Sequence, residues 1–259
     1  MIGPEFASCW LRIGRAQEHL NTFKREWHEW NDGGPYSTRR EHSADGGQHS
    51  MFLDIIKEPN LDRWSLLAAD CITSLRSALD NFVYALAVRD SGKTSPPDHR
   101  ALQFPITDTP ALFTESVKRK RLGQILAATQ ARIEKFQPYN RPHHHLPPLL
   151  GMIRDLDDTN KHRLLTVAFQ QIANGKFSFA RPHGRVYNLL YTLLPLKSGE
   201  KIASFCIDPP QLKLDYKHEI SMAISITHAV GPSGVGWSSL ADLLDYFIAE
   251  VSLVINTVV

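Results

Sequence analysis

Cysteine is scarce in this chain. Its 259 residues include only Cys9, Cys71 and Cys206, which lie far apart and form no CxxC pair. Neither a disulfide framework nor a cysteine zinc site is therefore indicated. No run of about eighteen apolar residues is present, so no membrane-spanning helix is expected. The N-terminus also lacks the basic start and apolar stretch of a secretory signal. These absences predict a cytoplasmic protein without membrane contact.

Sequence signatures of common enzyme classes are missing as well. The chain has no glycine-rich phosphate loop, no G-x-S-x-G elbow, no Rossmann fingerprint and no H-E-x-x-H zinc motif. No cofactor or resident metal is therefore expected. A net charge of +2 is too small to indicate nucleic-acid binding by itself. With 42% hydrophobic and 22% charged residues, the composition is that of a folded chain rather than a disordered one.

Hydrophobic periodicity predicts an α+β fold, a helical bundle with a small antiparallel β-sheet. Helical spacing of apolar residues covers Ala7–Trp30, Asp62–Arg89, Leu122–Phe136, Pro147–Gln170 and Trp237–Val258. A β-hairpin is expected from Tyr36 to Ile56, and further strands at Phe177–Ala180, Tyr187–Leu194, Ile202–Ile207 and Glu219–Thr227. Residues 1–170 then form a mainly helical region with the hairpin. Residues 171–259 supply antiparallel strands and a C-terminal helix that packs on the same core, in one domain.

Two of these helical segments carry unusual polar residues. The side of Asp62–Arg89 opposite its apolar stripe presents mostly short polar groups, where a solvated face usually favours Lys and Glu. On the Pro147–Gln170 segment, Asn160 falls inside the apolar arc and Arg163 near its edge. A buried amide without a partner costs about 1–3 kcal/mol, so Asn160 needs a partner on a neighbouring helix.

We therefore expect the two helices to meet through their polar residues. The candidate binding residues are Arg76, Asp80, Asn81 and Asn160, with Arg163 beside them. Two interpretations stay open at this point. The cluster is either a structural network that fixes the register of the helices, or the wall of a ligand or catalytic pocket.

Basic residues gather between Lys118 and Arg141. This stretch holds seven Lys or Arg residues and one acid, Glu134, a local balance of +6. Its core is Lys118, Arg119, Lys120 and Arg121, which is the candidate nucleic-acid contact because clustered cations release counterions on binding phosphate. No aromatic residues interleave with the basic core, so a solvated surface is the other interpretation.

Acidic and imidazole side chains recur at helical spacing near the end of the second polar segment. Asp155, Asp158 and His162 share one face, and such a face can hold a divalent metal or tune a histidine for proton transfer. The same grouping is also common on solvated helices. The run His143–His145 precedes this helix and is expected to lie in a loop without binding a metal.

The motif Leu75-Arg-Ser-Ala-Leu-Asp80, followed later by Asn160-Lys-His-Arg163, resembles an uncharacterised bacterial protein family that pairs an L-R-S-A-L-D helix with a D-K-H-R helix. Phe104-Pro-Ile106 and Phe136-Gln-Pro-Tyr139 belong to the same likeness, which extends over roughly residues 7–166. The resemblance implies no known activity. Asn160 stands where the family has Asp, so an acid role there is not carried over.

A more distant likeness is to the HEPN superfamily of helical bundles, which includes RNases. Their catalytic mark is Arg, four to six residues, then His, on a late helix. In this chain Arg154 and His162 are separated by seven residues, and Arg12 and His19 have the right gap on the first helix. The likeness therefore implies a fold rather than a catalytic site.

Two functions follow from different classes of protein. The first is a non-catalytic binding or interaction protein that contains the polar inter-helix cluster. The alternative is an RNase or phosphoesterase with His162 as acid/base and Arg163 or Lys161 stabilising phosphate charge. The sequence does not determine the partner; nucleic acid and a second copy of the chain both remain open.

Overall fold

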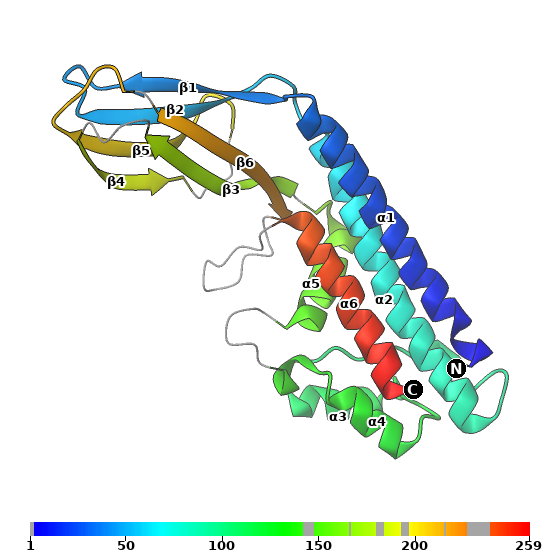
Figure 1. Cartoon of the computed structure of the whole chain (residues 1–259). Coiled ribbons are helices and arrows are strands. Elements are labelled where there is room, and N and C mark those ends of the chain that lie inside the picture. The colour runs from blue at the N-terminus through cyan, green and yellow to red at the C-terminus, as the bar shows by residue number, and fades with distance from the viewer. Residues whose placement is uncertain are drawn as a thin grey trace.

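The computed structural model describes residues 3–141, 148–165, 167–179, 184–192, 197–214, 216–226 and 239–259. Figure 1 shows helices gathered at one end of an elongated molecule and strands at the other. The helices are α1 (Ala7–Asp32), α2 (Leu61–Ser91), α3 (Pro110–Lys118), α4 (Ala127–Glu134), α5 (Leu149–His162) and α6 (Leu240–Val258). The strands are β1 (Tyr36–His42), β2 (Gln48–Ile55), β3 (Val167–Phe179), β4 (Arg185–Tyr191), β5 (Lys201–Asp208) and β6 (Tyr216–Ile226). The predicted α+β class is confirmed.

Helices α1 and α2 run side by side and form the long axis of the bundle (Figure 1). Where they approach the sheet, Trp27 stacks on Trp30 with ring centroids 5.2 Å apart, and both pack edge-on against Trp64 of α2. Asn60 caps α2 by accepting a hydrogen bond from the Arg63 N–H. The helix ends at Gly92, whose φ of +66° few other residues adopt readily. The predicted helix Asp62–Arg89 is thus confirmed within two residues at each end.

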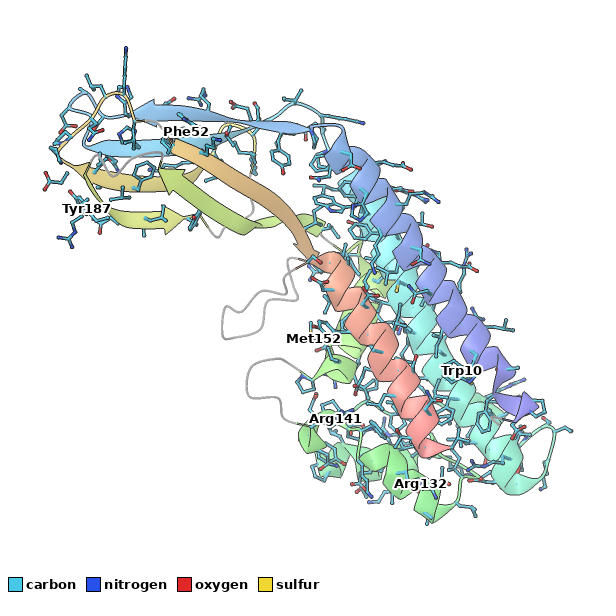
Figure 2. All side chains as sticks on the ribbon, viewed as in Figure 1. Trp10, Phe52, Arg132, Arg141, Met152 and Tyr187 are labelled. Carbon is cyan, nitrogen blue, oxygen red and sulfur yellow. The ribbon has the colours of Figure 1, made fainter. Side chains whose placement is uncertain are left out.

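Helix α6 lies across α1, α2 and α5 and closes the bundle. Its apolar face is fully buried, and the Ser239 hydroxyl caps it by accepting from the Asp242 N–H at 3.1 Å. Two arginines labelled in Figure 2 join the chain between α3 and α5 to this helix. Arg132 donates to the Val258 carbonyl at 3.2 Å, and Arg141 pairs with Glu250 at 2.6 Å.

The hairpin expected from Tyr36 to Ile56 is present as β1 and β2, which pair from Tyr36↔Ile55 to His42↔His49. Strand β2 then pairs with β5, which gives a four-stranded antiparallel sheet of order β1-β2-β5-β4. Strands β3 and β6 form a separate antiparallel pair. Residues from the first quarter of the chain therefore share a sheet with residues beyond 200.

Two helix predictions are wrong in part. The segment Pro147–Gln170 is helical only to His162, because the Arg163 backbone is extended (φ −161°, ψ 153°) and β3 begins at Val167. The segment Leu122–Phe136 is helical only from Ala127, since Lys120 and Gln124 adopt positive φ and the chain turns there. Helix α3 was missed, although Thr109 caps it and Pro110 occupies its first turn.

Candidate functional site between α2 and α5

Helices α2 and α5 meet at a buried carboxylate. The Asp157 side chain is 2% exposed and accepts a hydrogen bond from the Thr73 hydroxyl of α2 at 3.0 Å. Lys161, one turn further along α5, places its ammonium 2.8 Å from the other Asp157 oxygen. Every strong polar link between the two helices thus passes through Asp157.

The predicted partner of Asn160 is therefore wrong. Asn160 is half-buried and reaches only the Thr73 hydroxyl, at a long 3.5 Å, while Asp80 and Asn81 make no hydrogen bond to it. Because α5 ends two residues later, no following turn covers this position. Arg163 is exposed, and its described hydrogen bond is a backbone one, to the Thr159 carbonyl.

Asp80 instead holds the loop that follows α2. Its carboxylate accepts from the Phe104 N–H at 2.9 Å, and Arg76 donates to the Phe104 carbonyl at 2.8 Å. Arg76 and Asp80 also pair with one another at 3.0 Å. Burial raises the pKa of Asp80, and the opposing effects of Arg76 and the Phe104 N–H do not cancel this. The Arg and Asp of the L-R-S-A-L-D motif thus fix both backbone groups of a fully buried phenylalanine.

A cavity of about 230 Å³ opens beside this clamp, and we call it the α2–α5 pocket. Four of its lining side chains are cations and two are carboxylates. The lining consists of Arg76, Gln103, Phe104, Ile106, Arg121, Arg154, Asp157, Asp158 and Lys161.

Two cations of the α2–α5 pocket, Arg154 and Lys161, each bind two carboxylates. Arg154 binds Asp108 and Asp155, each at 2.8 Å, and Lys161 binds Asp157 and Asp158. The hydrogen bonds to Asp157 and Asp158 raise the pKa of Lys161. Lys161 therefore stays protonated near neutral pH and does not serve as a base.

The other two cations have donors to spare. Arg76 is 9% exposed, and its Nη1 is buried with no hydrogen-bond partner in the described part of the chain. The half-buried Arg121 guanidinium also makes no hydrogen bond or ion pair with any described residue. A buried donor left unpaired costs about 1–3 kcal/mol. An anionic group in the pocket would find unpaired donors on the half-buried Arg121.

His162 and, apart from Arg121, the basic core 118–121 lie outside the lining of the α2–α5 pocket. His162 is exposed and is not part of the lining. Within the basic core, Lys118 is exposed, Arg119 pairs with Glu115 at 2.9 Å and Lys120 pairs with Asp98 at 2.8 Å. Only Arg121 of that core reaches the pocket.

On the face that Asp155, Asp158 and His162 share, both carboxylates form ion pairs, since Asp155 binds Arg154 and Asp158 binds Lys161. Across the described ranges, no group of three or more His, Cys, Asp or Glu side chains is arranged to hold a metal ion. His143–His145 lies outside the described residues. None of the helices in the described part of the chain has the length and apolar character needed to span a bilayer.

Sequence reasoning missed Asp157, Arg154 and Gln103. A signal for Asp157 was present, because on a helical wheel of about 100° per residue it falls between Ile153 and Leu150, inside the apolar arc. A carboxylate at such a position needs a partner as much as an amide does. Gln103 carried no local signal, since it enters the pocket only because Arg76 and Asp80 hold Phe104.

Comparison with known proteins gives no relative on which to base an assignment. No protein-family model, no curated protein and no solved structure matches this chain.

Proposed function

We propose that this protein is a non-catalytic binding protein, and that its α2–α5 pocket takes the anionic group of a small ligand. One observation carries the proposal: the pocket is lined by four cations, and two of them, Arg76 and Arg121, keep donor atoms that are unpaired among the described residues. Guanidinium groups present several N–H donors in a fixed plane, which suits phosphate and carboxylate oxygens. The shared chemistry of the expected ligands is therefore an oxyanion.

The lining of the pocket supports binding rather than catalysis. None of its described side chains is an imidazole, a hydroxyl or a thiol. Its two carboxylates, Asp157 and Asp158, are both bound to Lys161. Covalent catalysis usually requires a nucleophile with an adjacent general base, and the described lining offers only these two ion-paired carboxylates for such roles. A volume of about 230 Å³ suits an anion of a few heavy atoms.

Calorimetric titration with inorganic phosphate and with citrate tests the proposal. Arg121→Gln removes a cation that has no described partner, so it should weaken binding about tenfold while leaving the fold intact. The matched control is Arg119→Gln, because Arg119 is nearby in the chain, exposed and paired with Glu115. Equal affinity in wild type and Arg121→Gln, or no heat change with either anion, would overturn the proposal.

The alternative, an RNase or phosphoesterase using His162, stays a prediction. Lys161 supports it, because this neighbour of His162 lines a cationic pocket that suits phosphate. The exposed position of His162 outside the lining weighs against it, since a general acid must reach the reacting group. Incubation with an RNA mixture distinguishes the two functions. Cleavage that disappears in His162→Ala would support the enzyme, and its absence in both proteins would support binding alone.

The likeness to the uncharacterised bacterial family and to HEPN bundles, a cytoplasmic location and contact with nucleic acid also remain hypotheses. For nucleic acid, the 118–141 stretch offers fewer free cations than its sequence suggests. Four of its seven basic residues already bind protein oxygens: Arg119, Lys120, Arg132 and Arg141.

A further inference from the structure

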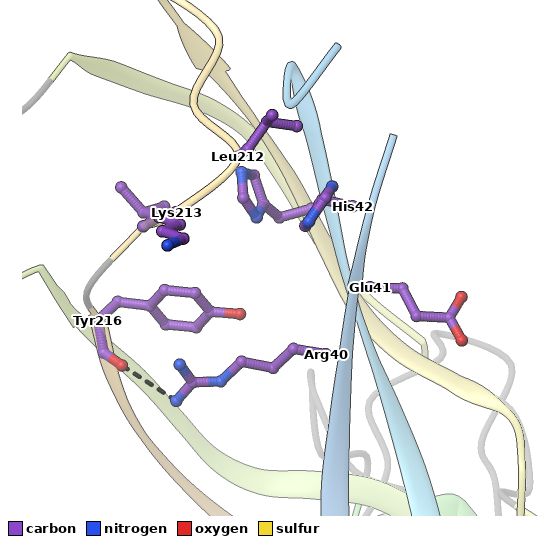
Figure 3. A pocket seen from close by; sticks show the side chains of 8 residues that line it. Arg40, Glu41, His42, Leu212, Lys213 and Tyr216 are labelled. Carbon is purple, nitrogen blue, oxygen red and sulfur yellow. Dashed lines mark hydrogen bonds between the residues drawn. The ribbon is translucent and has the colours of Figure 1, made fainter. Parts of the chain in front are cut away.

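A second cavity is lined by residues of β1, β2 and the chain that leads into β6. Figure 1 shows the β1–β2 turn at the end of the molecule opposite the helical bundle. We call this cavity the hairpin pocket, and its volume is about 410 Å³. It forms between the β1–β2 hairpin and the chain that connects β5 to β6 (Figure 3). Its lining consists of Arg40, Glu41, His42, His49, Leu212, Lys213, Leu214 and Tyr216.

The two walls of the hairpin pocket are joined by specific contacts. The Gln211 N–H donates to the Gly46 carbonyl at 2.9 Å, and the buried His49 shares a hydrogen bond of 3.0 Å with the Gln211 carbonyl. Gly46 has a φ of +74°, and a Cβ there would lie 2.5 Å from the Gln211 carbonyl carbon. This position therefore requires glycine. The close contact means that the pocket exists before any ligand enters.

Cations line one part of the hairpin pocket. The Arg40 guanidinium lies 4.1 Å from the centre of the Tyr216 ring and donates to the Tyr216 carbonyl at 3.1 Å. Lys213 is exposed beside them (Figure 3), and its ammonium makes no hydrogen bond or ion pair within the described residues. The acidic residue of the lining, Glu41, pairs with Arg39. The described side chains of the lining therefore carry a net positive charge. Asp215 lies outside the described residues.

The rest of the lining is apolar or aromatic. Leu212, Leu214 and the Tyr216 ring supply hydrocarbon surface, and His49 stacks on Phe205 behind the wall with ring centroids 5.3 Å apart. Surface of this kind favours a ligand with an apolar body. The Arg40 guanidinium already donates to a carbonyl and faces an aromatic ring, so Lys213 is the main cationic donor of the described lining. A pocket with few hydrogen-bond donors suits a single carboxylate better than a phosphate dianion.

We propose that the hairpin pocket is a second ligand site, which takes a small carboxylate attached to an apolar body, such as an aryl-alkanoate. Lys213 holds the carboxylate, the Arg40 guanidinium adds positive charge nearby, and Leu212, Leu214 and the Tyr216 ring cover the body. This site is independent of the function proposed for the α2–α5 pocket.

Saturation-transfer NMR with 3-phenylpropionate as the probe tests the second site, with 3-phenylpropylamine and inorganic phosphate as competitors. We expect the acid to bind and neither competitor to displace it. Lys213→Gln should weaken binding of the acid about tenfold, because it removes a charge-assisted hydrogen bond. Lys217→Gln, an exposed lysine outside the pocket, should bind as wild type does. Arg121→Gln should also bind as wild type, because it alters only the α2–α5 pocket.

Three outcomes would overturn the assignment. Unchanged affinity of Lys213→Gln for the acid would show that the Lys213 ammonium does not bind the carboxylate. Equal binding of the amine would show that charge does not select the ligand. Loss of binding in Arg121→Gln would show that 3-phenylpropionate binds in the α2–α5 pocket and not in the hairpin pocket. Because Lys213 is exposed, its substitution should leave the fold intact, and an amide NMR spectrum of the variant checks this.

Discussion

Arg76 and Asp80, one helical turn apart on α2, bind the carbonyl and the N–H of the same residue, Phe104, at 2.8 and 2.9 Å. An arginine and an aspartate at this spacing would form a surface ion pair of little value if they were exposed. In this protein they are partly buried and satisfy a loop backbone that would otherwise lack partners. Arg76 also lines the α2–α5 pocket, and its Nη1 is buried without a partner among the described residues.

The contact with Phe104 predicts a clear loss of stability in Asp80→Ala. The substitution leaves the Phe104 N–H without its acceptor and removes the ion-pair partner of Arg76. Hydrogen bonds to charged groups contribute about 1.5–3 kcal/mol. We expect the free energy of unfolding in urea to fall by about 2 kcal/mol. Asp70→Ala is the control, because Asp70 is exposed on the same helix. Equal stability of the two variants would show that the clamp contributes nothing.

The link between α2 and α5 predicts that Asp157 matters more than Asn160. Asp157→Ala deprives both Thr73 and Lys161 of a buried partner, so it should cost about 2 kcal/mol or more. Asn160→Ala removes one hydrogen bond of 3.5 Å, which is too long to contribute much. It should cost less than about 0.5 kcal/mol. Thermal melts of both variants in one buffer measure the difference, and the reverse order of stability would refute it.

The raised pKa of Asp80 predicts a pH dependence of stability. Its folded pKa lies above the ordinary value of 3.8, mainly because burial disfavours the charge. Its contribution to stability is therefore fully present below pH 3.8 and is lost as the pH rises through the folded pKa. Asp80→Asn cannot titrate. We expect wild type to gain stability relative to Asp80→Asn as the pH falls through this window, and a constant difference between them would contradict the shift.

The three cysteines should differ in reactivity. Burial raises the pKa of Cys9 to about 11 and that of Cys71 to about 12, whereas Cys206 is only half-buried. Because the thiolate is the nucleophile, we expect a disulfide reagent at pH 8 to modify only Cys206 in the folded protein. Unfolding in guanidinium should expose all three. Rapid labelling that persists in Cys206→Ser would contradict this assignment.

Short-range chemistry allowed several features to be predicted from the sequence. Apolar spacing identified α2, and the predicted hairpin of β1 and β2 closes at a turn in which Gly46 has positive φ. Such signals depend on residues within a few positions of one another, so they act before the chain has packed. They gave the α+β class and located the polar segments of α2 and α5.

The partners of the polar residues were decided only in the tertiary structure. Asp80 was expected to have a polar partner. That partner, the Phe104 N–H, lies 24 residues away along the chain, and no local sequence pattern indicates that the two meet. Asn160 had the right helical angle but sits too close to the end of α5 to be covered, so Asp157 takes the buried position. Residues 167–170 were assigned to a helix, yet pairing with β6 holds them in a strand. Periodicity determined which faces are buried, whereas long-range packing determined what those faces contact.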